Sequence, residues 1–407
     1  MVGLASAWYL AQQPGVQVTL VDRHADVAQE TSFANGGQLS YSYVAPLADP
    51  GVIGKLPQWL LRADSPLRFR PRLDPAQWRW CLEFLRACNN AKVRRTIGEM
   101  LSLSYLSRDA LDQLLAAHPL DFDLIRTGKL VVYRDPAALA AAAPMVDWQR
   151  RLGADQQILD GQGCVALEPS LQAIGADLAG GIYTPGEATG DCLRFCQGLK
   201  GLLTQLPNVR MALGVEVQAL VGERKQMVAV RTEVGDLPAD AVVVTAGMFS
   251  VPLLKPLGIS LPLYALRGYS LSVPLAPAIQ APRLSVTDAA RKVVYAPLAR
   301  HLRIAAMVDM GVSRADVDPG RIALLKQQVA ETFPHLDLTQ AQAWAGLRPS
   351  TAHSKPIVGR AGGYSNLWLN VGQGALGFTL ALGSARLLAA QMLNDPLPID
   401  PAPFQMR

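Results

Sequence analysis

Apolar and polar positions follow two patterns along this chain, one typical of strands and one typical of helices. Segments of the two kinds occur alternately from one end of the chain to the other. Short apolar runs bounded by glycine, proline or polar clusters predict strands at 16–21, 209–221, 227–232, 239–247, 269–273, 292–296, 302–306 and 367–371. Apolar residues at three- and four-residue spacing predict helices at 4–11, 56–118, 322–333 and after Gly377. A turn at Gly222 is expected to separate the strands at 209–221 and 227–232. The chain therefore mixes helices and strands throughout.

The order of these segments predicts a discontinuous architecture. Patterns typical of nucleotide-binding units occur at the start, the middle and the end of the chain, and 407 residues suffice for two domains with cores of their own. We expect an α/β protein with a discontinuous Rossmann-like domain formed by 1–50, 185–250 and 335–407. An inserted α+β substrate domain, with an antiparallel sheet and helices, is expected to comprise 51–184 and 251–334.

The pattern of the N-terminal segment predicts a helix, a turn and a strand, and an acidic residue follows the strand. In a dinucleotide-binding βαβ unit, an acid at the end of the second strand hydrogen-bonds a ribose hydroxyl. Asp22 takes that position here, with Arg23 beside it, about twenty residues after Gly3. Gly3 is expected to serve as the last glycine of the motif, where a small residue allows close helix–strand packing.

The first half of that unit lies outside the printed sequence. A complete unit has an apolar strand followed by two further glycines, and these would precede Met1. Two explanations stay open: the chain begins internally, or the protein lacks the motif and binds no dinucleotide. We expect the first.

Near the C-terminus, an apolar strand is followed by glycines 372, 374 and 377 and then a long helix. Glycines allow backbone amides to approach a ligand, and the start of the helix offers free N–H groups and a positive dipole end. Such a terminus suits an anion or a developing negative charge. A flavin ring gains negative charge on reduction, so this loop is a candidate flavin cradle.

Composition excludes several classes of protein. The five cysteines show no metal spacing, and no metal site is predicted. No secretory signal pattern is present at the N-terminus, so we expect a cytoplasmic protein. The longest charge-free stretch, 361–385, contains six glycines and polar amides, which argues against a membrane span.

Positive charge is concentrated between Lys55 and Arg95, where ten Lys and Arg residues face three acids, a local excess of seven. Trp59, Trp78 and Trp80 lie among them. Such a surface suits peripheral contact with the inner face of the cytoplasmic membrane. The alternative is that the cations cover helix faces while the tryptophans pack inside. No nucleic-acid motif accompanies the charge, so no nucleic-acid partner is expected.

Six segments together resemble FAD-dependent D-amino acid dehydrogenases of the glycine oxidase and D-amino acid oxidase superfamily, and the resemblance covers nearly the whole chain in order. The segments are ETSFANGGQLS (30–40), TGDC (189–192), TAGMFS (245–250), LRGYSL (266–271), WAGLRPSTAHSKPIVGR (344–360) and NVGQGALGFTLALGS (370–384). Singly each is weak, because each also reads as an ordinary turn or strand end. As a set they imply an FAD cofactor and a D-amino acid substrate.

The resemblance assigns cofactor contacts along these segments. Hydroxyls, an amide and two glycines gather in the loop at 30–40, which could otherwise be a self-satisfied polar turn. The implied FAD-binding residues are Gly3, Asp22, Arg23, Thr31, Ser32, Asn35, Gly36, Gly37, Gln38, Leu39, Val217, Ala246, Gly247, Gly372, Gln373, Gly374, Gly377, Phe378 and Thr379. Gln373 and Phe378 depart from the family, where His and Trp are common. Gln can hydrogen-bond like neutral His but does not titrate.

Arg348 is the main substrate candidate, because a guanidinium binds a carboxylate in a bidentate fork. Tyr269 and Tyr264 are candidates to donate to the other carboxylate oxygen, with a core position as the alternative for both. The implied reaction is oxidative deamination of a D-amino acid to a 2-oxo acid and ammonia, with a quinone or another carrier as acceptor. The sequence offers no clear general base.

Two other functions stay open. One is an oxidase of the glycine, sarcosine or D-proline type, which would produce peroxide. The other is a non-catalytic protein on a flavoenzyme scaffold. The oligomeric state is not predicted.

Overall fold

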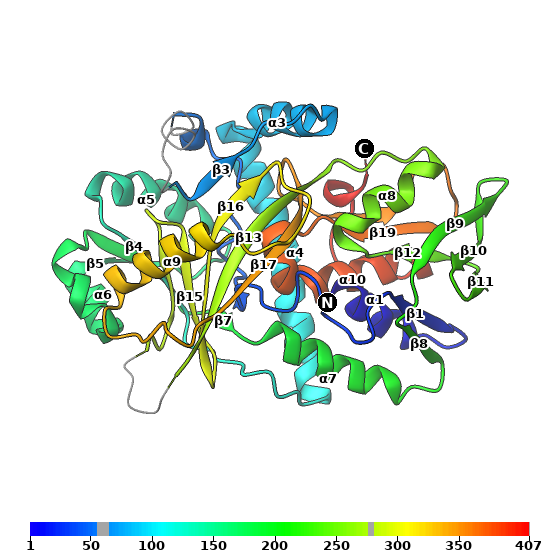
Figure 1. The fold of residues 1–407 in the computed structure, drawn as a ribbon, viewed down its shortest axis with the longest axis horizontal. Helices are drawn as coiled ribbons and strands as arrows, with labels where there is room; N and C mark the ends of the chain where they lie inside the picture. Colours follow the sequence, from blue (N-terminus) through cyan, green and yellow to red (C-terminus); the bar gives the residue numbers. More distant parts are fainter. Residues whose placement is uncertain (55–64, 276–280, 407) are drawn as a thin grey trace.

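The computed structural model describes residues 1–54, 65–275 and 281–406. Trp59, with Lys55 and Arg62 of the basic region, lies outside the described residues. Figure 1 shows one large sheet on the left and several small sheets with their helices on the right. The mixed α/β class predicted from the sequence is confirmed.

The large sheet joins segments from four separate stretches of chain. Its strands run in the order β17-β13-β16-β15-β14-β4-β6-β5, with β3 paired to β16. Their bounds are β3 Leu67–Phe69, β4 Lys129–Tyr133, β5 Gln157–Asp160, β6 Gly180–Thr184, β13 Leu263–Pro274, β14 Ser285–Asp288, β15 Val293–Pro297, β16 His301–Met310 and β17 Gln342–Thr351. Most neighbours are antiparallel, but β14 pairs with β4, and β16 with β3, in parallel.

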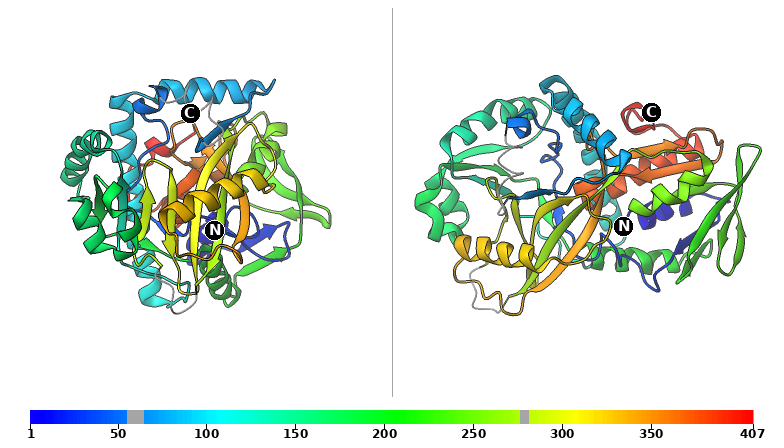
Figure 2. Two further views of the ribbon diagram at one scale, coloured as in Figure 1. Left: turned by 60° about the vertical axis from the view of Figure 1, so that its left-hand side comes forward. Right: turned by 45° about the horizontal axis from the view of Figure 1, so that its top comes forward.

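Helices cover the outer parts of this sheet. α9 (Pro319–Thr332) crosses one face, visible in Figure 2, and buries Leu325 and Val329 against the sheet. α5 (Pro136–Arg151) and α6 (Gly161–Leu167) lie beside β4, β5 and β6. Asp318 and Asp135 cap α9 and α5, each with a proline in the first turn, which explains where these helices begin.

The small sheets form the other half. β1 (Val18–Asp22) pairs in parallel with β8 (Val209–Leu213), and β12 (Val242–Val244) pairs in parallel with β19 (Leu367–Val371), which also pairs with β18 (Ile357–Arg360). β9 (Val217–Glu223), β10 (Gln226–Thr232) and β11 (Gly235–Pro238) form an antiparallel sheet. β2 (Gln38–Leu39) pairs with β7 (Ala188–Thr189). The short helix α8 (Ser250–Leu254) follows β12.

Three buried helices hold this half together. α1 (Val2–Ala11), α7 (Cys192–Thr204) and α10 (Gly377–Leu393) share a core with residues such as Phe195 and Leu382. The long α4 (Asn90–Ala117) packs along α10, where the Ser107 hydroxyl accepts a hydrogen bond of 3.0 Å from Gly383 N. Gly383 has no room for a side chain there, because a Cβ would lie 2.7 Å from Leu103 O.

Two sequence-based element predictions were wrong in detail. The segment 56–118 contains the strand β3 and two helices, α3 (Pro75–Ala87) and α4, because Asp74 and Asn89 each cap a new helix. The single strand predicted at 209–221 is two strands, β8 and β9, and Gly222 lies inside β9. The turn after β9 is formed by Arg224 and Lys225, both at positive φ.

Candidate active site

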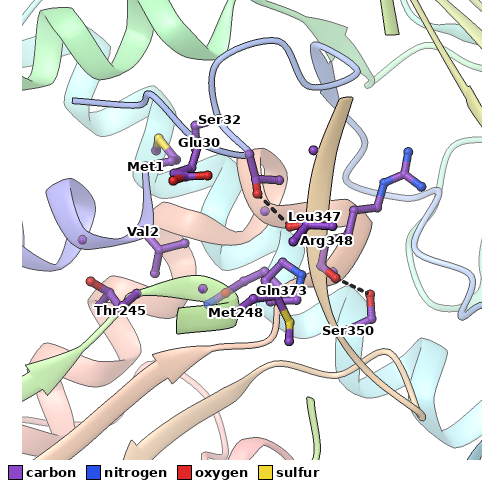
Figure 3. A pocket seen from close by; sticks show the side chains of 18 of the residues that line it. Met1, Val2, Glu30, Ser32, Thr245, Met248, Leu347, Arg348, Ser350 and Gln373 are labelled. Carbon is purple, nitrogen blue, oxygen red and sulfur yellow. Dashed lines mark hydrogen bonds between the residues drawn. The ribbon is translucent and has the colours of Figure 1, made fainter. Parts of the chain in front are cut away.

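A cavity of about 2060 Å³ opens between the large sheet and the small sheets. Figure 3 shows it from close by, with Arg348, Ser350 and Gln373 together on one side and Thr245 and Val2 on the other. Most of the predicted site residues line it, although they come from distant parts of the chain. These are Gly3, Asp22, Arg23, Thr31, Ser32, Asn35, Gly36, Gly37, Gln38, Val217, Ala246, Gly247, Tyr269, Arg348, Gln373, Gly374, Gly377, Phe378 and Thr379.

Three predicted residues do not line the cavity. Leu39 is 2% exposed and packs in the core of α1, α7 and α10. Gly372 lies just outside the lining, at φ +83°, where its backbone conformation lets the chain turn from β19 into the glycine loop. Tyr264 packs against Trp80, with 6.4 Å between the ring centroids.

The loop after β1 is fixed to the large sheet by its polar side chains. Thr31 Oγ1 donates to Leu347 O at 2.7 Å, which ties the loop to β17 beside Arg348. Asn35 Oδ1 accepts from Gly37 N at 3.0 Å and closes a tight turn. Gly37 has φ +62°, so the turn favours glycine at that position. The loop therefore presents backbone and glycine surfaces to the cavity.

The start of α10 forms the adjoining wall. No side chain caps this helix at Leu376, and the surrounding residues Gly374 and Gly377 line the cavity. Uncapped first-turn N–H groups and the positive end of the helix dipole therefore face the cavity. Gln373 Nε2 donates to Asn370 Oδ1 at 2.7 Å, so this side chain is held by the protein and not by a ligand.

The other end of the cavity carries charged residues. Asp22 Oδ1 accepts from His24 N at 2.9 Å at the end of β1. Arg23 pairs with Glu30, and its guanidinium lies 3.7 Å from the centroid of the Phe249 ring. Burial would raise the pKa of Glu30, but hydrogen bonds from His24 and Arg23 outweigh it and lower that pKa.

Arg348 is half-buried and differs from the buried arginines of the structure. Arg267 and Arg321 both pair with Asp309, and Arg303 lies 3.7 Å from Asp191. Within the described residues, Arg348 Nη1 donates to the carbonyl of Met307 at 3.2 Å, and no carboxylate pairs with the guanidinium. Burial lowers the pKa of Arg348 to about 10, with no nearby charge to offset it. It remains a cation at neutral pH.

The two tyrosines lie in different surroundings. Tyr269 belongs to the lining of the cavity, but its side chain is buried in the core that includes α9, and its hydroxyl donates to Asp309 Oδ2 at 2.7 Å. Burial first, and the neighbouring Asp309 second, raise the pKa of Tyr269. The hydroxyl that the sequence suggested for substrate binding is thus engaged inside the protein. Tyr264 is half a strand away and outside the lining.

The described residues contain no cluster of His, Cys, Asp or Glu suited to a metal ion. Cys192 and Cys196 share a face of α7, and both are buried free thiols.

Comparison with known proteins identifies the family. A family model described as FAD dependent oxidoreductase matches residues 1–391. The chain belongs to this family. The oxidoreductase is 47% identical over 416 residues to D-amino acid dehydrogenase 2 of Ralstonia nicotianae, covering 100% of this chain and 97% of that protein. It is 48% identical to D-amino acid dehydrogenase 2 of Pseudomonas aeruginosa, over 98% of this chain and 94% of that protein.

Solved structures share the fold of the oxidoreductase. Glycine oxidase from Geobacillus kaustophilus superposes with a TM-score of 0.76 at 19% identity, covering 100% of this chain and 95% of the other. A dithionite-reduced L-α-glycerophosphate oxidase from Mycoplasma pneumoniae, solved with FAD bound, gives a TM-score of 0.71 at 17% identity, with 96% and 92% covered. These likenesses establish the fold. The family establishes FAD as the cofactor.

The cavity residues of the oxidoreductase fit FAD. The acid at the end of β1 suits a ribose hydroxyl, and the glycine loop before the uncapped α10 suits the ring edge that becomes negative on reduction. Gly377 has open space where a side chain would stand, apart from Gln373 Cβ at 3.9 Å. Gly3 allows close packing, because a Cβ there would lie 2.8 Å from Thr245 Oγ1. Which residues contact the cofactor stays a prediction.

Sequence reasoning missed two features of the cavity. Lys129 lines it although it opens an apolar strand, KLVVY; a lone lysine at the edge of a buried run was the available signal. Gly268 faces the Arg348 guanidinium, and the GY pair in LRGYSL gave no hint of that contact.

Proposed function

We propose that this FAD-dependent oxidoreductase oxidises D-amino acids to 2-oxo acids and ammonia and passes the electrons to a quinone or a similar carrier. The observation that carries the proposal is Arg348, a half-buried cation without a carboxylate partner in the described residues, facing the cavity that fits the flavin. Removing a guanidinium from water without a counter-charge is costly, which supports a ligand carboxylate as its partner. The relatives at 47% and 48% identity support the D-amino acid as substrate.

Arg348 would orient the substrate. A bidentate fork fixes the carboxylate plane, and with it the direction of the Cα–H bond, so the residue contributes through proximity and orientation. Gly268 beneath the guanidinium and Met307 O beside it hold the fork in place. The bound FAD supplies a hydride acceptor. Apolar residues of the lining beside Arg348, such as Met307 and Leu347, would exclude water from the reacting carbon.

The first experiment compares D- and L-enantiomers of several amino acids with an artificial quinone acceptor under anaerobic conditions. The proposal expects a yellow preparation that reduces the acceptor with D-amino acids and releases ammonia and the 2-oxo acid. A colourless preparation that takes up no FAD would favour the non-catalytic alternative. Rapid oxygen consumption with peroxide, and weak quinone reduction, would favour the oxidase alternative.

The proposal that a quinone accepts the electrons is supported by the exposed surface of helix α3. Trp78, Leu82 and Leu85 lie at helical spacing and are 51%, 48% and 44% exposed. Arg79 and Arg86 flank this apolar stripe. Trp78 and Leu85 also line the cavity, so the stripe lies at its rim. An apolar stripe beside arginines suits a membrane surface with anionic lipids, where a lipid-soluble quinone would be available.

Vesicle flotation tests this contact. The protein is expected to bind vesicles that contain anionic lipid, and less so neutral ones, with binding reduced by salt. Leu82→Ser together with Leu85→Ser should weaken the binding at least severalfold without changing flavin content. Leu167→Ser, on α6 and 36% exposed, is the matched control. Equal vesicle binding by the wild type, the α3 double variant and Leu167→Ser would contradict the proposal that α3 contacts the membrane.

The membrane contact is peripheral in this proposal, on the inner face of the cytoplasmic membrane. The stretch Gly374–Leu393 is long and apolar enough to cross a membrane by composition, but 67% of its window is buried inside the protein. It contains α10, whose apolar surface packs against α1 and α4. A core helix passes the same test of length and composition.

A further inference from the structure

Lys129 places an amino group at the wall of the cavity. It is the first residue of β4, is 2% exposed and lines the cavity. Its Nζ donates to Gln38 Oε1 at 2.7 Å and to Ser40 Oγ at 3.3 Å, and lies 4.1 Å from the centroid of the Tyr43 ring. A lysine so deeply buried is unusual unless it is paired or has a function.

The contacts of Lys129 place it at the flavin-ring end of the cavity. Gln38 and Ser40 belong to the segment that touches the start of α10. There, Thr379 Oγ1 accepts from Ser40 N at 3.0 Å and donates to Gln38 O at 3.3 Å. The start of α10 is the wall that fits the ring. Lys129 therefore stands near the reacting part of the cavity and not near the Asp22 end.

The electrostatic surroundings of Lys129 shift its titration toward neutral pH, so that the uncharged amine is more accessible than in an exposed lysine. Burial lowers the pKa of Lys129 to about 8, and Glu187 opposes that shift only in part. Glu187 is 1% exposed, and its Oε1 accepts from Ser42 N at 2.7 Å. Burial raises the pKa of Glu187 itself, and Lys129 counteracts this. Tyr43 and Lys292 are the other ionisable residues of the adjoining cavity wall.

The hydrogen bonds of Lys129 also suit a neutral amine. An ammonium group has three N–H donors and no lone pair, whereas a neutral amine has two donors and one lone pair. Gln38 and Ser40 provide two acceptors, which satisfy the two donors of the neutral form. The lone pair is then left over to accept a proton.

Four other ionisable groups of the described cavity wall are poorly suited to that task. Asp22 and Glu30 lie at the end that fits the ribose, and Glu30 is engaged with Arg23. The Tyr269 hydroxyl is held by Asp309, and burial keeps its pKa far above neutrality. Arg348 stays charged. Oxidation of an amino acid requires a free amine, because the nitrogen lone pair must form the C=N bond as hydride leaves Cα.

We propose that Lys129 is the proton acceptor for the α-ammonium group of the bound amino acid, a role that rests on the proposed function. In this step one N–H bond of the ammonium breaks and a new N–H bond forms on Lys129 Nζ. The electron pair stays on the substrate nitrogen, so nothing is oxidised or reduced. Gln38 and Ser40 hold Nζ in place during the transfer, and the resulting lysine ammonium is shared with Tyr43 and Glu187.

The test measures equilibrium binding to the FAD-loaded protein, with two ligands that cannot be oxidised. 2-Aminoisobutyrate carries the ammonium and carboxylate but has no Cα–H; isobutyrate lacks the amine. Neutral Lys129 accepts a hydrogen bond from the ligand ammonium, whereas charged Lys129 repels it. The affinity for 2-aminoisobutyrate should therefore rise about tenfold from one pH unit below to one unit above the Lys129 pKa. Isobutyrate affinity should stay level or fall.

Three variants make the result specific to this side chain. Lys129→Met should bind 2-aminoisobutyrate without the pH step, and Lys129→Arg should bind it weakly at every pH because its charge is permanent. Lys326→Met, on α9 and outside the cavity lining, should keep the step of the wild type. Flavin absorbance and circular dichroism report whether each variant is folded and loaded.

Two results would overturn the assignment of Lys129: absence of the pH step in the wild type, or the same step in Lys129→Met. If Lys129→Met does not fold, two measurements still test the role of Lys129. They are the comparison of the two ligands with the wild type and the affinity of Lys129→Arg for 2-aminoisobutyrate. These outcomes are separate from a failure of the proposed function, which would show as no oxidation of D-amino acids by the wild type.

Discussion

The Arg348 guanidinium lies against the Cα of Gly268, on the neighbouring strand of the large sheet. A Cβ at residue 268 would overlap the guanidinium, so glycine at this position gives the arginine its place. The pairing of β13 with β17 brings the two residues together, since Gly268 faces Gly346 and Leu266 faces Arg348 in that register. Substrate orientation in the proposed reaction depends on this contact.

Gly268→Ala should therefore displace Arg348 without unfolding the protein. We expect a fall of about 10- to 100-fold in kcat/KM for D-amino acids, equivalent to about 1.4–2.7 kcal/mol. Steady-state kinetics and flavin content measure the effect. Gly98→Ala, in α4 with open space around it, is the control and should keep full activity with equal or higher stability. Unchanged kinetics of Gly268→Ala would contradict the proposed role of the contact.

Arg348→Lys tests the fork rather than the charge. Lysine keeps a cation but loses the bidentate geometry, and Arg348→Ala loses both. Because charge-assisted hydrogen bonds contribute about 1.5–3 kcal/mol each, Arg348→Ala should raise KM about 100-fold or more, with FAD still bound. Arg348→Lys should lie between the wild type and alanine. Equal KM values for all three proteins would show that Arg348 is structural.

A negative charge at the start of α10 should shift the flavin potential. Ala375 lies in the turn before this helix and lines the cavity. An aspartate there would oppose the negative charge that the ring acquires on reduction. Dipole-scale interactions of about 0.3–1 kcal/mol correspond to a decrease of about 6–20 mV in the two-electron midpoint potential.

The comparison with Ala375→Asn separates charge from size. Spectroscopic redox titration with a reference dye gives the potentials of both variants. The asparagine variant should stay close to the wild type. An increase in potential for Ala375→Asp, or equal shifts for both variants, would show that the start of α10 does not face the reducible ring.

The buried pair of Glu99 and Lys355 should contribute to stability in a pH-dependent way. Lys355 Nζ donates to Glu99 Oε2 at 2.7 Å and joins α4 to the turn after β17. Burial would raise the pKa of Glu99, but the hydrogen bonds from Lys355 and Arg95 outweigh it and lower that pKa. Because the pKa of Glu99 is lower in the folded than in the unfolded state, its ionised form stabilises the fold at pH values above the unfolded-state pKa. This contribution is lost as the pH falls through the folded-state pKa.

Glu99→Gln should lower the free energy of unfolding by about 1–3 kcal/mol at neutral pH, and by less in acid. Denaturant unfolding at several pH values measures it. Glu331→Gln, whose side chain is 46% exposed beside Arg291, is the control and should change stability by less than about 1 kcal/mol. A pH-independent difference for Glu99→Gln would rule out the ion pair as its cause.

Local patterns predicted three elements of the small-sheet half well. The helix at 4–11, the strand at 367–371 and the helix after Gly377 all lie within one or two residues of the observed elements, because each is an apolar run with clear end signals. The breaks within 56–118 were missed because their capping residues, Asp74 and Asn89, also occur in ordinary loops. Apolar spacing does not show where one helix ends and another begins.

Motifs predicted which segments gather at the cavity, but not what each side chain contacts. Arg348 and Gln38 line it as expected. The Tyr269 hydroxyl turns instead to Asp309, which lies 40 residues away and is brought there by the pairing of β13 with β16. Lys129 reaches the cavity because the pairing of β4 with β14 sets Lys129 opposite Ser285, and Gln38 contacts both residues. Long-range strand order determines such contacts, and single-sequence patterns do not contain it.

The tight packing of α4 against α10 affects how substrate can enter and leave the cavity. Gly383 N and Ser107 Oγ are joined at 3.0 Å, and the backbones there leave no space for a side chain. Helices locked this tightly resist hinge-like separation of the regions they connect. Ligand passage in and out of the chamber must then rely on small rearrangements at its rim, where α3 stands.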